Sequence, residues 1–204
     1  HGFVGDVFTV NGKIQPYLEV KRRKYRFRWL DASIARWYDF KLMSGSPVPA
    51  PGVQGQYLLN NAQQVMRFTL IAGDGGLIHR PLVQDTIHLI PAKRRCVIVD
   101  FCRYMDGSPT KPGDVVYLTN ILEMEGGRKP DGQTPGYNVP VLKFIIGDDP
   151  PTPDLSVVPP FLRPIPPVRP ASHLAKLPTR EWVLERSGGE WLINDEAFDP
   201  QRPL

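Results

Sequence analysis

The sequence predicts an all-β fold of the Greek-key sandwich or barrel type, and three observations support this prediction. Short apolar runs separated by turn residues recur over residues 5–146. Within residues 20–30, basic and aromatic side chains alternate with the period of a strand that buries one face. Strand-like runs return after a proline-rich segment, at residues 181–194. With 204 residues, the chain is long enough to bury the core of one ordinary domain.

The first predicted strands lie on either side of a tight turn. Residues 7–10 lead into Asn11-Gly12, a dipeptide that favours two-residue hairpin turns. The next strand is predicted over residues 20–30, and its period places three aromatic side chains on the buried face: Tyr25, Phe27 and Trp29.

Six more strands and one long loop are predicted in the same region. The loop covers residues 44–55, where serine, proline and glycine leave little to bury. Asp74, within residues 73–76, is interpreted as a turn residue rather than an acid catalyst. The six strands are predicted at residues 37–42, 65–72, 86–90, 95–101, 115–118 and 141–146.

The chain changes character at residue 147, where a segment with ten prolines begins. Prolines favour an extended, semi-rigid linker, although the sequence PPFLRPIPPVRP within it also fits a ligand of proline-binding domains. A hairpin follows, and a lone hairpin is marginally stable in water. We therefore expect a domain over residues 1–146, a linker over residues 147–180, and a hairpin over residues 181–204 that opens a further domain.

The charge balance is close to neutral for a chain of this length. Lysine and arginine number 25 against 21 acidic residues, which gives a net charge of +4 and does not indicate a nucleic-acid partner. The densest basic runs, residues 21–24 and 93–95, adjoin predicted strands, so we interpret them as solvated strand ends.

The two cysteines are expected to be free. Cys96 lies in the predicted strand of residues 95–101 and Cys102 follows it directly, and six positions of extended chain separate them by about 20 Å. Cα atoms more than roughly 7 Å apart cannot be bridged by a disulfide. The sequence also contains no apolar run of the length of a membrane span, so no membrane partner is expected.

Three ordered segments of the first region, and a fourth near residue 194, resemble the multicopper oxidases related to spore-coat laccase, bilirubin oxidase and phenoxazinone synthase. Residues 10–36, VNGKIQPYLEVKRRKYRFRWLDASIAR, resemble the chain that leads into the second domain of these proteins. The runs LIAGDGGLIHRPL and LIPAKRRCVIVDF resemble a later turn and strand, and INDEAFDP resembles the opening of the third domain. The resemblance implies a cupredoxin-like sandwich. Three positions depart from the family pattern: Asp31 replaces the usual asparagine, Lys93 an acidic residue, and Cys96 an aspartate.

The copper ligands of that family cannot be carried onto this sequence. They come from His-x-His and His-Cys-His motifs, because such sites need imidazole and thiolate donors that converge on one metal. The chain has only four histidines, none in such a motif: His1, His79, His88 and His173. We therefore expect no catalytic, cofactor-binding or metal-binding residues here, and copper only in the intact parent protein.

The resemblance implies a structural, copper-free central domain that is not catalytic alone, so whether the chain acts as an enzyme stays open. The intact parent would be secreted and would oxidise phenols or aryl amines while reducing dioxygen. Its partners would be neighbouring cupredoxin domains or chains, and the hairpin also allows an oligomer. One alternative is a stand-alone β-sandwich binding module without redox activity. A weaker alternative is a copper enzyme that uses the amino group and imidazole of His1, because HGFV resembles the start of lytic polysaccharide monooxygenases.

Overall fold

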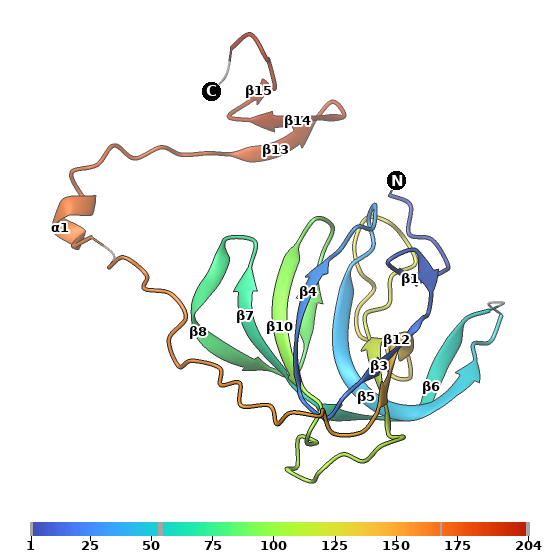
Figure 1. Cartoon of the computed structure of the whole chain (residues 1–204). Coiled ribbons are helices and arrows are strands. Elements are labelled where there is room, and N and C mark those ends of the chain that lie inside the picture. Colours follow the sequence, from blue (N-terminus) through green and yellow to red (C-terminus); the bar gives the residue numbers. More distant parts are fainter. Residues whose placement is uncertain (1, 53–54, 168, 203–204) are drawn as a thin grey trace. The chain divides into compact units, whose positions relative to one another are not determined.

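A computed structural model of the chain describes residues 2–52, 55–167 and 169–202. It divides into two units, residues 1–164 and residues 165–204, which we describe separately (Figure 1). No helix within the described residues is long and apolar enough to cross a membrane.

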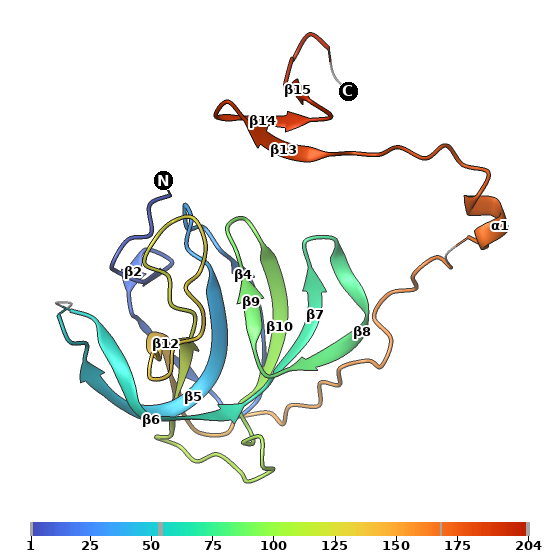
Figure 2. The same ribbon diagram turned by 180° about the vertical axis from the view of Figure 1, so that it is seen from behind.

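The described part of the first unit is built from β-strands arranged in two main sheets (Figures 1 and 2). One sheet has the order β4-β10-β7-β8, and the other has the order β3-β12-β11-β5-β6 with β9 paired to β5. Neighbours are antiparallel except for β3 and β12, which are parallel. The strands are β1 (Thr9–Val10), β2 (Lys13–Ile14), β3 (Tyr17–Val20), β4 (Lys24–Leu30), β5 (Tyr38–Pro49), β6 (Tyr57–Met66), β7 (Phe68–Gly73), β8 (Gly76–Gln84), β9 (Ile87–Leu89), β10 (Arg94–Asp100), β11 (Val115–Asn120) and β12 (Val139–Ile146).

The main core is an apolar cluster contributed by both main sheets, and a second, smaller apolar cluster includes Met43 of β5 and Tyr117 of β11. Trp29 meets Phe68 with ring centroids 5.5 Å apart, and Phe27 meets Phe144 at 5.6 Å. Arg26 lies on the exposed face of the same strand, as the alternation predicts. These observations confirm the all-β sandwich. Its largest fully buried side chains include Phe68, Phe101, Phe144, Leu42 and Met66.

Residues 20–30 are not one strand, contrary to the prediction. β3 ends at Val20 in one sheet and β4 begins at Lys24 in the other. Three successive basic residues, at positions 21–23, connect the two strands, and their charge favours an exposed crossing over a continuous ladder. Arg22 also forms an ion pair of 3.1 Å with Asp149, which ties this crossing to the chain that follows β12.

The predicted loop over residues 44–55 is wrong in its first half, because β5 continues to Pro49. Beyond Met43, β5 pairs only with β6, so its prolines need no donor toward a second neighbour. Gly45 sits at a bulge with φ +155°, where a Cβ atom would lie 2.9 Å from the carbonyl oxygen of Asn60.

The strand predicted over residues 65–72 is divided, and β8 was missed. β6 ends at Met66 and β7 begins at Phe68. β8 contains glycine, arginine and Pro81 and lacks a clean alternation, so its strand conformation comes from its pairing with β7. The turn at Asp74 joins these two strands, as predicted.

The second unit is a small antiparallel sheet of β13 (Leu184–Ser187), β14 (Glu190–Ile193) and β15 (Glu196–Ala197). A hairpin is present, as predicted, and Gly188 and Gly189 form its two-residue turn with φ +59° and +92°. A short helix, α1 (Ala171–Leu174), interrupts the proline-rich segment and was not predicted. It occupies one of the stretches between prolines, where the backbone amides of its residues are free to bond.

Candidate functional site

The histidines that the sequence singled out do not come together. His1 lies outside the described residues. His79 is in β8, His88 is in β9, and His173 is in α1 of the second unit. Among the described residues, no three histidine, cysteine, aspartate or glutamate side chains form a group that could hold a metal ion.

The cysteines are free, as predicted, with Cys96 in β10 and Cys102 just after it. Burial, together with a hydrogen bond to the Asp100 carboxylate and its negative charge, raises the pKa of the Cys102 thiol to about 11. Cys102 is therefore a protonated thiol at neutral pH rather than the thiolate that binds metals or attacks electrophiles.

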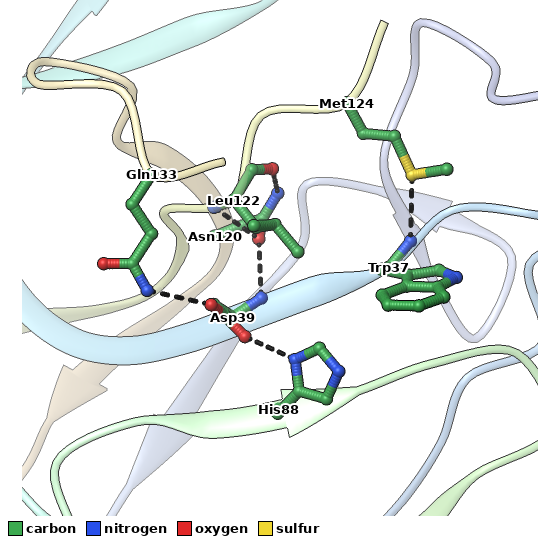
Figure 3. Close-up of polar contacts among 7 residues, drawn as sticks. All are labelled: Trp37, Asp39, His88, Asn120, Leu122, Met124 and Gln133. Atoms are coloured by element: carbon green, nitrogen blue, oxygen red, sulfur yellow. Dashed lines mark hydrogen bonds and ion pairs between the residues drawn. The ribbon is translucent and has the colours of Figure 1, made fainter. Parts of the chain in front are cut away.

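The most developed polar cluster is centred on Asp39 of β5 (Figure 3). Its Oδ1 lies 2.6 Å from Nδ1 of His88, which is directly opposite it in the pairing of β5 with β9. Its Oδ2 accepts a hydrogen bond of 2.9 Å from Nε2 of Gln133. The Asp39 side chain is only 13% exposed, so the two bonds satisfy a largely buried carboxylate.

Asn120, at the end of β11, closes the cluster from the other side (Figure 3). Its Oδ1 accepts the backbone N–H of Asp39 at 3.0 Å and that of Leu122 at 3.2 Å. Its Nδ2 donates to the carbonyl oxygen of Leu122 at 3.0 Å. The fully buried Asn120 thus fixes the chain that leaves β11 against β5.

The cluster orients the imidazole of His88 but contains no nucleophile that this imidazole could activate. The Asp39 carboxylate faces Nδ1 and orients the His88 ring, as a carboxylate orients the histidine of a hydrolytic triad. Yet the seven residues in Figure 3 include no hydroxyl or thiol nucleophile. Trp37 instead packs edge-on against the His88 ring at 5.7 Å. The arrangement fits a rigid connection between β5, β9 and the segment after β11.

A second polar centre, Arg36, holds the incoming segment of the chain. It is 7% exposed, and it donates to the carbonyl oxygens of Val4 at 3.0 Å, Gly5 at 2.6 Å and Met124 at 3.3 Å. Its guanidinium also lies over the Phe8 ring. One buried cation therefore joins the first residues of the unit to the segment after β11.

Asp31 occupies the corner between β4 and β5 and is 3% exposed. Its Oδ1 accepts the backbone N–H of Ser33 at 2.8 Å, but Oδ2 has no partner among the described residues. Burial raises the pKa of Asp31 above its usual value, although the bonds from Ser33 oppose this effect. The hydroxyls of Ser33 and Tyr38 bond each other 2.8 Å apart beside it.

Sequence reasoning missed these polar centres. Asp39 falls within a predicted strand, between positions that alternate into the core, and nothing local marks it as special. His88 is 49 positions away, and no pattern in the sequence shows that β9 pairs with β5. The one available signal is that Arg36 and Asp39 are charged residues within an otherwise apolar, aromatic run.

No family model matches the chain. It is 30% identical over 198 residues to bilirubin oxidase of Albifimbria verrucaria, a match that covers 97% of this chain and 30% of that protein. It is 38% identical over 102 residues to cell division protein FtsP of Edwardsiella tarda, covering 50% of this chain and 17% of that protein.

A solved structure agrees over nearly the whole chain. The McoA multicopper oxidase of the hyperthermophile Aquifex aeolicus matches 96% of this chain and 35% of its own, with a TM-score of 0.68 and 26% identity. The chain thus spans about a third or less of the length of each of these three proteins. Sequence and fold agree that the chain, with its cupredoxin-like sandwich, belongs to the multicopper oxidase family.

Proposed function

We propose that this chain is the copper-free central part of a multicopper oxidase. Residues 1–146 would be its second cupredoxin-like domain, residues 147–180 the linker, and residues 181–204 the first hairpin of the third domain. The observation that carries the proposal is the match to oxidases along almost the whole chain. In addition, the histidine, cysteine and acidic side chains of the described residues form no group that could hold a metal ion.

The second unit supports its assignment to an incomplete domain. None of its described residues is buried, so it has no core of its own. A small sheet without a covered face is marginal in water and needs further chain to pack against. Its most exposed large apolar side chains are Leu184, Trp191 and Phe198, at 74%, 73% and 87%.

The contacts of the first unit support a positioning role. Arg36 fixes the incoming residues Val4 and Gly5. At the other end, Asp154 accepts the backbone N–H of Lys24 at 2.8 Å, which fixes the outgoing chain at the start of β4. A domain that holds both of its connections would keep its neighbours at a defined separation, as electron transfer between copper centres requires.

In the intact protein, copper held by the neighbouring domains would take electrons from phenols or aryl amines and pass them to dioxygen. The residues of this chain would supply packing and part of the wall of the substrate cleft. They would hold no electron-transfer centre of their own.

Copper analysis of the purified chain tests this proposal. After incubation with Cu(II) and dialysis, we expect neither stoichiometric copper, nor the intense blue absorbance of a copper-thiolate bond, nor oxidation of a phenol such as 2,6-dimethoxyphenol. Stoichiometric copper with blue absorbance and turnover would overturn the proposal. Copper that binds one-to-one and is lost when the N-terminus is acetylated would instead favour the His1 enzyme.

The second candidate, a binding module without redox activity, is favoured by the FtsP match, because that relative is named for cell division rather than for oxidation. The two candidates differ in the state of the second unit. A fragment of an oxidase should bind a dye for exposed apolar surface through Trp191 and Phe198, whereas a self-contained module should not.

A further inference from the structure

The outgoing chain docks on the open edge of β8. β8 pairs with β7 on one side and is the last strand of its sheet. Along its other side, the backbone N–H of Leu162 donates to the carbonyl oxygen of His79 at 3.0 Å. Nδ1 of His79 in turn lies 2.8 Å from the carbonyl oxygen of Arg163 and, facing an acceptor, carries the hydrogen. The backbone of residues 161–163 is thus held at two successive positions.

Side chains hold the same three residues. The Phe161 ring meets the His79 ring edge-on, with centroids 5.6 Å apart. The guanidinium carbon of Arg80 lies 4.7 Å from the centroid of the Phe161 ring. Nη1 of Arg163 donates to the carbonyl oxygen of Gly75 at 3.1 Å, in the turn before β8. His79 and Arg80 of β8 therefore both contact the Phe161 ring, and Arg163 bonds the turn before β8.

The sequence around residues 161–163 favours binding along the edge of β8. Prolines at positions 159, 160 and 164 surround it and favour an extended backbone, so that little conformational entropy is lost on docking. An uncovered edge strand exposes unpaired backbone groups, and a docked segment covers them. β8 also contains Pro81, which cannot donate and so limits how far a partner strand could pair there.

We propose that Phe161–Arg163 is an anchor that docks the outgoing chain on the edge of β8, so that the free connection to the second unit begins at Ile165 and not at residue 147. Less than half of the proline-rich segment would then be available as a tether. The anchor uses only residues of the first unit and does not depend on the copper-free role proposed above.

Hydrogen exchange at the Leu162 amide, followed by NMR in the full-length chain, tests the anchor. In the wild type, we expect this amide to be protected and the Ile165 amide to exchange freely. His79→Ala should lower the protection at Leu162 about fivefold or more, because it removes a hydrogen bond and a ring contact. Arg80→Met keeps the stem of the side chain and should lower the protection about two- to fivefold, as expected for an exposed cation–π contact.

Arg26→Met is the matched control, since Arg26 is an exposed strand arginine on β4, and it should leave the protection at Leu162 unchanged. Chymotrypsin provides a second measurement, because cleavage after Phe161 should be faster in His79→Ala and in Arg80→Met than in the control. Equal exchange at Leu162 and Ile165 in the wild type would overturn the anchor, as would wild-type protection in both variants. Neither measurement involves copper, so failure here and failure of the proposed function are separate results.

Discussion

The guanidinium carbon of Arg36 lies 4.9 Å from the centroid of the Phe8 ring, so a buried cation covers an aromatic residue of the incoming segment. Arg36→Met would keep the apolar stem but leave carbonyl oxygens without their donors. We expect it to lower the free energy of unfolding by about 2–4 kcal/mol, measured by urea denaturation.

Arg28→Met, on the exposed face of β4, is the control for Arg36 and should change stability by no more than about 0.5 kcal/mol. If Arg36→Met is equally harmless, Arg36 does not hold the incoming segment.

Asp31→Asn tests the cost of the buried carboxylate. Because burial raises the folded-state pKa of Asp31, the folded protein binds its proton more tightly than the unfolded chain does. The resulting stabilisation is fully present below the unfolded pKa of about 3.9 and is lost as pH rises through the folded pKa. Relative to the Asn variant, the wild type should therefore lose stability as pH rises.

The measurement for Asp31 is the free energy of unfolding in urea at several pH values from 4 to 8, compared between wild type and variant. Asp106→Asn is the control, because hydrogen bonds from Ser108 lower the pKa of that exposed carboxyl. The stability that Asp106 contributes should change in the opposite direction, because it is lost as pH falls. If the wild type instead became more stable relative to Asp31→Asn as pH rises, the prediction would be wrong.

The pair of Asp39 and His88 should be energetically coupled. Asp39→Asn and His88→Gln each disturb the 2.6 Å contact, but after the first change the second has less to remove. A double-mutant cycle in urea should therefore give a coupling energy of about 0.5–1 kcal/mol, the range for a partly exposed hydrogen bond. Additive effects of the two substitutions would show that the contact does not stabilise β9.

Cys102 should react slowly with alkylating agents. A thiol whose pKa is about 11 has roughly a hundredfold less thiolate at pH 8 than one at the ordinary value of 9.0. Iodoacetamide labelling followed by mass spectrometry should show much slower modification of Cys102 in the folded protein than in urea. Asp100→Asn should speed the folded-state reaction, because it removes the negative charge beside the thiol.

Local patterns in the sequence predicted the parts of the fold that depend on local chemistry. The alternation around Phe27 predicted the buried face of β4, and the strand-like runs of residues 181–194 predicted the hairpin of the second unit. β8 could not be predicted, because pairing with β7 and not its own composition makes it a strand. The division between β3 and β4 also depends on tertiary structure, since the two strands join different sheets.

The polar centres escaped prediction for the same reason. Asp39, His88 and Gln133 are brought together by strand pairing and by a distant segment, and each alone is an ordinary surface residue type. The lack of His-x-His motifs, by contrast, could be observed directly in the sequence. Motif absence is a property of composition and order, whereas a buried hydrogen-bond cluster is a property of topology.

The parallel pairing of β3 with β12 has a consequence for how the domain forms during synthesis. Leu18 lies opposite Phe144, and nearby Gln15 bonds the carbonyl oxygen of Pro140, 125 positions further along the chain. A contact of such long sequence separation carries a large loop-closure cost and is slow to form. As the chain leaves the ribosome, β3 has no strand partner until β12 has emerged. The sheet would therefore close last along the seam between its earliest and latest strands, and a ribosome stalled before residue 146 would present β3 as an unpaired edge.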